Sequence, residues 1–182
     1  MGGPSVFPPI PAGITDQNYN SEFKWETSVA ADQYRRGMYT FFKRTAPHPN
    51  LMTFDCPESS VACASRNRSN TPLGALVILN NEVYIEAAQA LGQRLAGMVS
   101  VGDQQRIRLG FQLCLVRPPT EAEMAVLLEV LGASRQWYQS RPEEAGQRIE
   151  NHAAHGQPDY ETASWTAVAR VIMNLDEMIV RD

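Results

Sequence analysis

The chain has 182 residues, of which 43% are hydrophobic and 20% charged, and its formal net charge is −4. This length suits one folded domain with a substantial core, and the composition is that of a globular protein. A negative net charge gives no indication of a nucleic-acid surface, and no apolar run approaches the roughly 18–20 residues that a membrane-spanning helix needs. We therefore expect no nucleic-acid partner and no membrane span. The N-terminus also lacks the pattern of a signal peptide.

Residues 1–30 are predicted to form an extended, proline-rich lead-in. Pro4, Pro8, Pro9 and Pro11 fix the backbone φ angle and remove amide donors, which excludes a helix and favours a polyproline-like path. Such a segment needs a surface to lie on. The abrupt beginning MGGPSVFPPIPAG is more typical of the interior of a longer protein. We divide the chain into this lead-in and a helical domain, residues 31–182.

The first helix is predicted over residues 31–45, where Tyr34, Met38 and Phe41 recur at intervals of four and three. A loop is predicted from residue 48 to residue 70, because Ser, Asn, Pro and two cysteines break both helical and strand patterns. Its length exceeds that of most loops and indicates either a function or tight packing.

A second helix is predicted to begin at Pro72 and to continue to about residue 96. Thr71 offers a side-chain oxygen just before Pro72, and proline suits the first helical position because its missing N–H is not needed there. The segment is apolar on more than one face, so we expect it to be the central, most buried element. Asn80 interrupts it with a polar side chain. A buried amide at Asn80 is either satisfied internally, which we favour, or contacts a ligand.

Four more helices follow in the sequence. Residues 103–117 and 120–138 are predicted to form a helical hairpin, the second helix being opened by a capping box of Thr120 and Glu123. A short polar helix starts at Pro142, and an amphipathic helix covers residues 163–180. No two segments make convincing paired strands. The predicted class is all-α: a single helical domain of about six helices, with an extended N-terminal segment and one long ordered loop.

Cations and polar side chains gather around the predicted helix start at Pro72. Unpaired N–H groups, the helix dipole and guanidinium forks all favour an anion at such a junction. Three hypotheses stay open: a site for an anionic ligand such as an acidic or sulfated glycan, an enzyme with Asp55 as acid or base, and arginines that only form structural ion pairs. The candidate ligand-binding residues are Arg36, Lys43, Arg44, Arg66, Arg68, Asn70, Thr71 and Asn80.

Other patterns of chemical interest are weak. His152 and His155 lie three residues apart, but no set of neighbours completes a metal site, so no metal is predicted. Cys56 and Cys63 could pair in an oxidising compartment, which their spacing alone does not decide. Without a CxxCH motif, covalent haem attachment is excluded, and no cofactor is predicted in this chain.

Several blocks of the sequence closely resemble the family of the domain of unknown function 1553. They are YRRGMYTFFKRTAPHPNLMTFD (residues 34–55), RNRSNTPLGALVILNNEVYIEAAQAL (66–91), RIRLGFQLCLVRPPTEAEM (106–124) and WTAVARVIMNLDEMIVR (165–181), together with GGPSVFPP near the start. Where the family commonly has Asn-Asp-Pro, this chain has Asn80, Asn81 and Glu82. A carboxylate role at position 81 is therefore unsupported.

The resemblance implies a larger context. Members of the family are typically the C-terminal parts of large planctomycete-type bacterial proteins, and they usually carry a cytochrome-c-like haem module upstream. It implies that this chain is the C-terminal part of such a domain, that the parent protein is exported to the periplasm or beyond, and that the upstream domains are its partners. The alternative activities are those of a hydrolase or a haem-assisted oxidase, since the activity of the family is not established.

Overall fold

The computed structural model describes residues 2–10, 24–57, 61–65 and 69–180. Within these ranges it contains eight α-helices, two short 3-10 helices, one isolated β-bridge and no strand, which confirms the all-α class. The chain divides between Gly74 and Ala75 into two compact units, here called the N-terminal unit (Met1–Gly74) and the C-terminal unit (Ala75–Asp182). The predicted division after residue 30 stays a prediction.

The N-terminal unit has little regular structure. Its elements are the 3-10 helices η2 (Ala30–Tyr34) and η3 (Gly37–Tyr39) and the helix α1 (Pro49–Thr53), which lies inside the predicted loop. The helix predicted over residues 31–45 is wrong. The backbone is extended at Arg35 and Arg36, with ψ angles of 151° and 146°, so no helix can continue through them.

A long-range bridge explains why the helical pattern fails there. Val6 donates its N–H to the carbonyl of Tyr39 and accepts the N–H of Phe41, both at 2.8 Å, and Val6 pairs with Thr40 as an isolated parallel bridge. The backbone groups that a helix would use are thus satisfied by the N-terminal segment instead. Val6 is also almost completely buried, so the pairing adds apolar contact to hydrogen bonding.

The described start of the chain, residues 2–10, lies against other parts of the N-terminal unit, as its proline-rich sequence predicted. Arg35 donates to the carbonyls of Gly2 and Pro4 at 2.7 and 3.0 Å, and the indole Nε1 of Trp25 donates to the carbonyl of Pro8 at 2.8 Å. A proline-rich segment cannot satisfy its own carbonyls by forming a helix. Side chains from elsewhere in the N-terminal unit satisfy them.

His48 ties the N-terminal segment to helix α1. Its Nδ1 accepts the N–H of Asn50 at 3.2 Å, so Nε2 is the protonated nitrogen that faces the carbonyl of Pro9 at 3.1 Å. The ring is 3% exposed and lies 5.9 Å from the ring of Trp25. Burial lowers the pKa of His48, because desolvation disfavours the imidazolium form.

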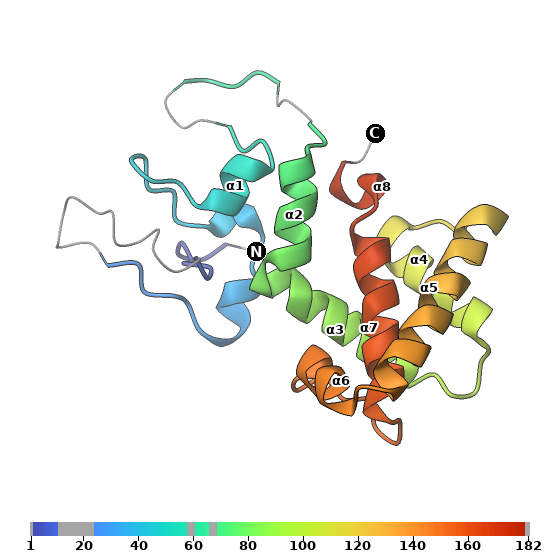
Figure 1. The fold of residues 1–182 in the computed structure, drawn as a ribbon. Helices are drawn as coiled ribbons and strands as arrows, with labels where there is room; N and C mark the ends of the chain where they lie inside the picture. The colour runs from blue at the N-terminus through green and yellow to red at the C-terminus, as the bar shows by residue number, and fades with distance from the viewer. Residues whose placement is uncertain (1, 11–23, 58–60, 66–68, 181–182) are drawn as a thin grey trace. The chain divides into compact units, whose positions relative to one another are not determined.

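In the C-terminal unit, helices α3, α4, α5 and α6 pack around α7 (Figure 1). Helix α7 packs against α3 most extensively and against α5 and α6 as well. Trp165 of α7 is fully buried in the main core with Leu95, Ile107 and Phe111. The helices are α2 (Pro72–Asn80), α3 (Glu82–Ala96), α4 (Asp103–Leu115), α5 (Glu121–Gln139), α6 (Pro142–Ile149), α7 (Asp159–Met173) and α8 (Asp176–Ile179).

The contact between α3 and α7 is unusually close. A Cβ atom added to Gly92 of α3 would lie 2.5–2.7 Å from the side-chain oxygen, the backbone nitrogen and the Cα of Thr166 in α7. Only a glycine allows the two backbones to approach in this way. The hydroxyl of Thr166 donates back to the carbonyl of Thr162 at 2.9 Å, so no polar group is stranded at this interface.

Helix boundaries from Pro72 onward confirm most local signals and correct two predictions. Helix α2 begins at Pro72, α6 begins at Pro142, and the capping box of Thr120 and Glu123 opens α5, as predicted. The single helix predicted over residues 72–96 is wrong, because Asn81 leaves the helix and caps α3 by accepting the N–H of Val83. That segment is also not the most buried element, since α7 occupies the centre.

The last predicted helix also differs in extent. Helix α7 begins at Asp159, earlier than the predicted residue 163, and Asn174 separates it from the short helix α8. None of the helices in the described part of the chain combines the length and the apolar character that crossing a bilayer requires.

Candidate functional site

The helix start predicted at Thr71 and Pro72 is present, and the hydroxyl of Thr71 already accepts a hydrogen bond within it. Thr71 accepts the N–H of Gly74 at 3.1 Å, which satisfies one of the free donors in the first turn of α2. Asn70 is exposed next to it. An anion at this helix end would therefore meet the remaining N–H groups of the first turn rather than the threonine oxygen.

Asp55, the weak catalytic candidate, holds the loop that precedes α2. Its carboxylate oxygen Oδ2 accepts both the N–H and the hydroxyl of Ser69, each at 2.7 Å. Its backbone has a φ of 54°, in the left-handed region that aspartate tolerates better than most residues. These two bonds join the ends of the segment between residues 55 and 69. This is the arrangement of a carboxylate that fixes a loop.

The predicted cations of the N-terminal unit differ in how they are used. The side chains of Arg36 and Arg44 are exposed, and neither side chain makes a hydrogen bond or ion pair with another described residue. Lys43 is partly buried and is not free of interactions. Arg66 and Arg68 lie outside the described residues. Arg35, which was not predicted as a site residue, is fully engaged with the N-terminal segment and stacks on Tyr39.

Asn80 does not behave as a buried amide. Its side chain is exposed, and Nδ2 donates to the carbonyl of Leu76 one turn earlier at 2.8 Å. The expectation of burial is wrong because α2 ends at this residue, where the carbonyls of the last turn need donors. The favoured alternative, a locally satisfied amide, describes Asn80. This residue belongs to the C-terminal unit, whereas the other candidates belong to the N-terminal unit.

The densest charge cluster of the described residues was missed by sequence reasoning. Arg135 of α5 makes paired hydrogen bonds to Asp103 of α4, at 2.6 and 3.0 Å, and to Glu161 of α7. Glu161 also accepts the indole N–H of Trp165 at 2.9 Å, and Arg106 lies 3.9 Å from Glu161. The hydrogen bonds from Arg135 lower the pKa of Asp103. Two arginines and two carboxylates thus neutralise each other between three helices.

A second network surrounds the capping box of α5. Arg117 bonds both carboxylate oxygens of Glu123, at 2.9 and 2.6 Å, and both oxygens of Glu177 in α8. Glu123 in turn accepts the N–H of Thr120 at 2.7 Å. Hydrogen bonds from Arg117 lower the pKa of Glu123 to about 2. The capping-box pattern was visible in the sequence, but the arginine that completes the network lies outside the pattern.

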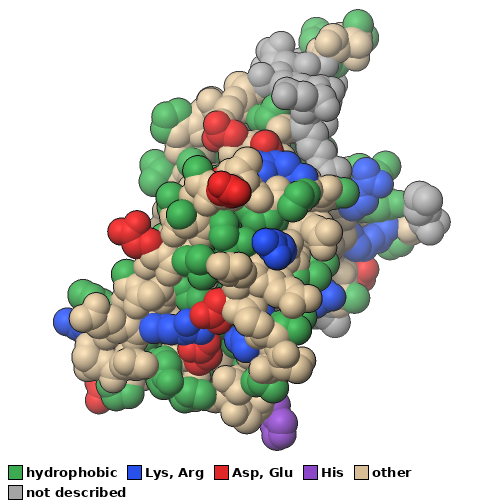
Figure 2. Space-filling view, turned by 90° about the vertical axis from the view of Figure 1, so that its right-hand side faces the viewer, with side chains coloured by type: hydrophobic (Ala, Val, Ile, Leu, Met, Phe, Trp, Pro, Cys, Tyr) green, Lys and Arg blue, Asp and Glu red, His purple; other side chains and the backbone are tan. Residues whose placement is uncertain are grey.

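Basic and acidic side chains are also interspersed on the surface. On the face shown in Figure 2, basic and acidic side chains lie beside one another instead of gathering in a large patch of one sign. This arrangement favours internal pairing of arginines over a broad electrostatic platform on that face.

Other candidate chemistry is sparse in the described ranges. No group of three or more His, Cys, Asp or Glu side chains there could hold a metal ion. Cys56, Cys63 and Cys114 are free thiols, and burial raises the pKa of Cys114. A shallow groove of about 320 Å³ lies between α4 and α5, lined by Arg108, Met124 and Leu128 among others. It contains none of the predicted site residues.

The fold and its charge networks define an all-α domain in which arginine–carboxylate pairs connect the helices. Residues 1–131 match the model of the family described as protein of unknown function (DUF1553), and the chain belongs to this family. The family is the one that the sequence blocks resemble. No curated protein and no solved structure matches the chain.

Proposed function

We propose that this protein is a non-catalytic accessory domain that binds an anionic ligand, such as an acidic or sulfated glycan, through its N-terminal unit. The observation that carries the proposal is that the side chains of Arg36 and Arg44 are exposed and have no hydrogen-bond or ion-pair partner among the described residues. A purely structural role would engage these guanidinium groups with carboxylates or carbonyls, as happens to Arg35 only one residue away. Exposed forks are available to sulfate or carboxylate groups of a ligand.

The geometry gives less support to an enzyme. The alternative of a hydrolase or a haem-assisted oxidase needs Asp55 as an acid or base that can reach a substrate. Asp55 instead accepts two hydrogen bonds from Ser69 and closes a loop. The family context adds the proposal of an exported parent protein with a haem module upstream.

The proposal is tested by isothermal titration calorimetry of the full chain with a sulfated oligosaccharide, an oligogalacturonate and a neutral oligosaccharide of equal length. Exposed ion pairs are worth about 0.2–1 kcal/mol each, so the double variant Arg36→Ala/Arg44→Ala should raise Kd about two- to thirtyfold. The matched control is Arg94→Ala/Arg108→Ala, which removes the same charge from two exposed arginines of the C-terminal unit that form no ion pair with any residue the structure describes.

The outcomes separate specific binding from bulk electrostatics. We expect the neutral oligosaccharide not to bind and the control variant to keep the affinity of the wild type. Equal weakening in both double variants would mean that only net charge matters, and absence of heat with either acidic ligand would refute the proposal.

A further inference from the structure

Two partly buried arginines of the C-terminal unit differ from its other buried arginines in their charge partners. Four of its partly or fully buried arginines form ion pairs with carboxylates: Arg106, Arg117, Arg135 and Arg141. Arg148 of α6 and Arg170 of α7 are also partly buried, yet neither pairs with an acidic side chain among the described residues. A guanidinium group that loses water without gaining a counter-charge is unfavourable. These two groups therefore call for an explanation that the helical packing does not supply.

The contacts of the two arginines leave most of their donors free. Arg148 donates from Nε to the hydroxyl of Tyr138 at 3.1 Å, and Arg170 donates from Nη2 to the carbonyl of Leu79 at 2.6 Å. Their other N–H groups meet no acceptor in the described part of the chain. The hydroxyl of Tyr138 accepts from Arg148 and has its own hydrogen available. The two guanidinium groups and the phenol of Tyr138 therefore all keep N–H or O–H donors for a further acceptor.

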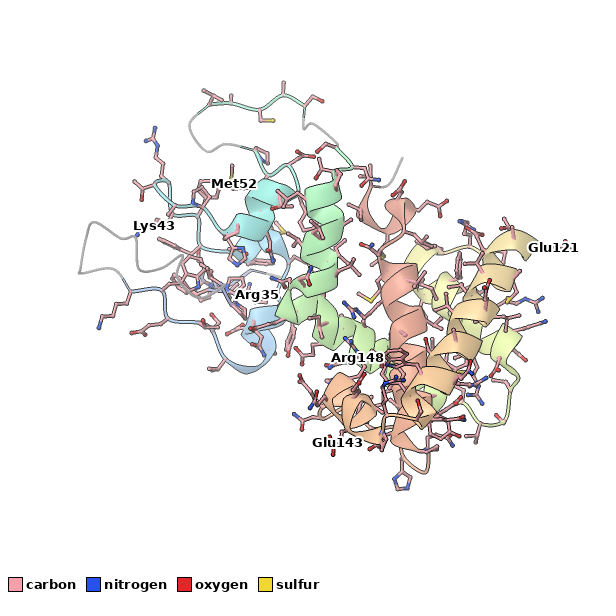
Figure 3. The ribbon with its side chains drawn as sticks, viewed as in Figure 1. Arg35, Lys43, Met52, Glu121, Glu143 and Arg148 are labelled. Carbon is pink, nitrogen blue, oxygen red and sulfur yellow. The ribbon has the colours of Figure 1, made fainter. Side chains whose placement is uncertain are left out.

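Several helices hold these donors close together. Figure 3 shows Arg148 on α6, which packs against α7. Gln89 of α3 is buried and donates to the carbonyl of Arg148 at 2.8 Å, which fixes α6 against α3. The pKa of Arg170 is lowered by burial and by the positive charge of Arg148, and Tyr138 partly opposes this effect. Ala88 of α3, next to Gln89, packs with Ala169 of α7, next to Arg170, so Arg148 and Arg170 border the same stretch of α3.

We propose that Arg148, Arg170 and Tyr138 form a binding site for a phosphate or sulfate group. A tetrahedral dianion has enough oxygens to accept from both forks and from the phenol, and its charge cancels the repulsion between the arginines. A single carboxylate offers only two oxygens and one charge, so it fits this array less well. The site lies in the C-terminal unit and is independent of the ligand proposed for Arg36 and Arg44.

The test measures thermal stability of the full chain in inorganic phosphate and, in a separate series, in sulfate, with ionic strength held constant by sodium chloride. At a concentration ten times Kd, the wild type should gain about 3–6 °C in Tm. The variant Arg148→Gln should lose this gain. The control Arg94→Gln removes an exposed arginine of the same unit, one without an ion pair in the described part of the chain, and should keep the gain in Tm. The two series distinguish a phosphate site from a sulfate site.

A second readout protects the test against a variant that is merely destabilised. Without added anion, Arg148→Gln should be at least as stable as the wild type, because one of two repelling charges is gone. Line broadening in the phosphorus NMR spectrum of phosphate should disappear with Arg148→Gln but not with Arg36→Ala/Arg44→Ala. Equal Tm gains in chloride and phosphate, or an undiminished gain in Arg148→Gln, would overturn the proposal.

Discussion

The N-terminal and C-terminal units are held together by different interactions. In the N-terminal unit, a proline-rich segment without regular structure is bound by side chains that come from far along the chain, such as Arg35, Trp25 and His48. In the C-terminal unit, regular helices satisfy their own backbone, and side chains join helix to helix through apolar contacts and arginine–carboxylate pairs. The first unit depends on single contacts to backbone carbonyls, whereas the second depends on close packing.

The largest expected effect tests the close packing of the C-terminal unit. Gly92→Ala should lower the free energy of unfolding by about 3 kcal/mol or more, because its Cβ would overlap backbone atoms of Thr166 that cannot move independently. Gly132→Ala is the matched control in an exposed, open position of α5 and should stabilise by about 0.5–1 kcal/mol. Urea denaturation followed by circular dichroism measures both. Similar small effects would show that α3 and α7 are not in tight contact.

The buried charge network should give the next largest effect. Glu161→Gln removes the carboxylate that Arg135 and Arg106 share, and leaves guanidinium charge under-compensated at the core. We expect a loss of about 2–3 kcal/mol. Glu129→Gln, at an exposed site of α5, should change stability by less than about 0.5 kcal/mol. Fluorescence of Trp165, which donates to Glu161, should also shift in the first variant only.

The two units should lose stability at different pH values as the solution is acidified. The pKa of His48 is lowered in the folded state, so the unfolded chain takes up the proton first, and the N-terminal unit should lose stability as pH falls below about 6.5. The pKa of Glu123 is lowered to about 2, so its contribution is present above its usual value of about 4.5 and is lost only as pH falls from there towards 2.

Hydrogen exchange measured by mass spectrometry can follow each unit through this titration. Between pH 6.5 and pH 5, exchange corrected for its intrinsic pH dependence should rise in the N-terminal unit and stay constant in the C-terminal unit. His48→Asn keeps a side-chain acceptor for the cap of α1 and cannot be protonated in this range, so it should remove the change. A parallel response of both units would contradict the assignment to His48.

The smallest expected effects compare two helix caps. Thr120→Ala breaks a capping box in which Thr120 and Glu123 exchange hydrogen bonds, and should cost about 1–2 kcal/mol. Thr71→Ala removes a single bond to Gly74 and should cost about 0.5–1 kcal/mol. Chemical denaturation of the two variants gives the order, and a larger loss at Thr71 would mean that this residue does more than cap α2.

Sequence patterns predicted elements well where one turn of chain contains the whole signal. Pro72, Pro142 and the pair Thr120 and Glu123 mark helix starts that the structure confirms. Periodicity failed over residues 31–45, where Tyr34 and Met38 are exposed and the backbone of Tyr39 and Phe41 is hydrogen-bonded to Val6 instead of forming a helix. The sequence predicted the candidate site only in part. The exposure of Arg36 and Arg44 and the hydrogen bonds of Asp55 to Ser69 depend on the folded chain.

By itself, the sequence determined the all-α class, the hairpin of α4 and α5 and the family to which the chain belongs, because caps, prolines and apolar repeats act over a few residues. Only the tertiary structure decided that α7 is central, that Arg135 joins Asp103 to Glu161, and that Arg148 and Arg170 lack a counter-charge within the described ranges. These features join residues that are distant in the chain, and the charge partner of an arginine is chosen by helix packing rather than by its sequence neighbours.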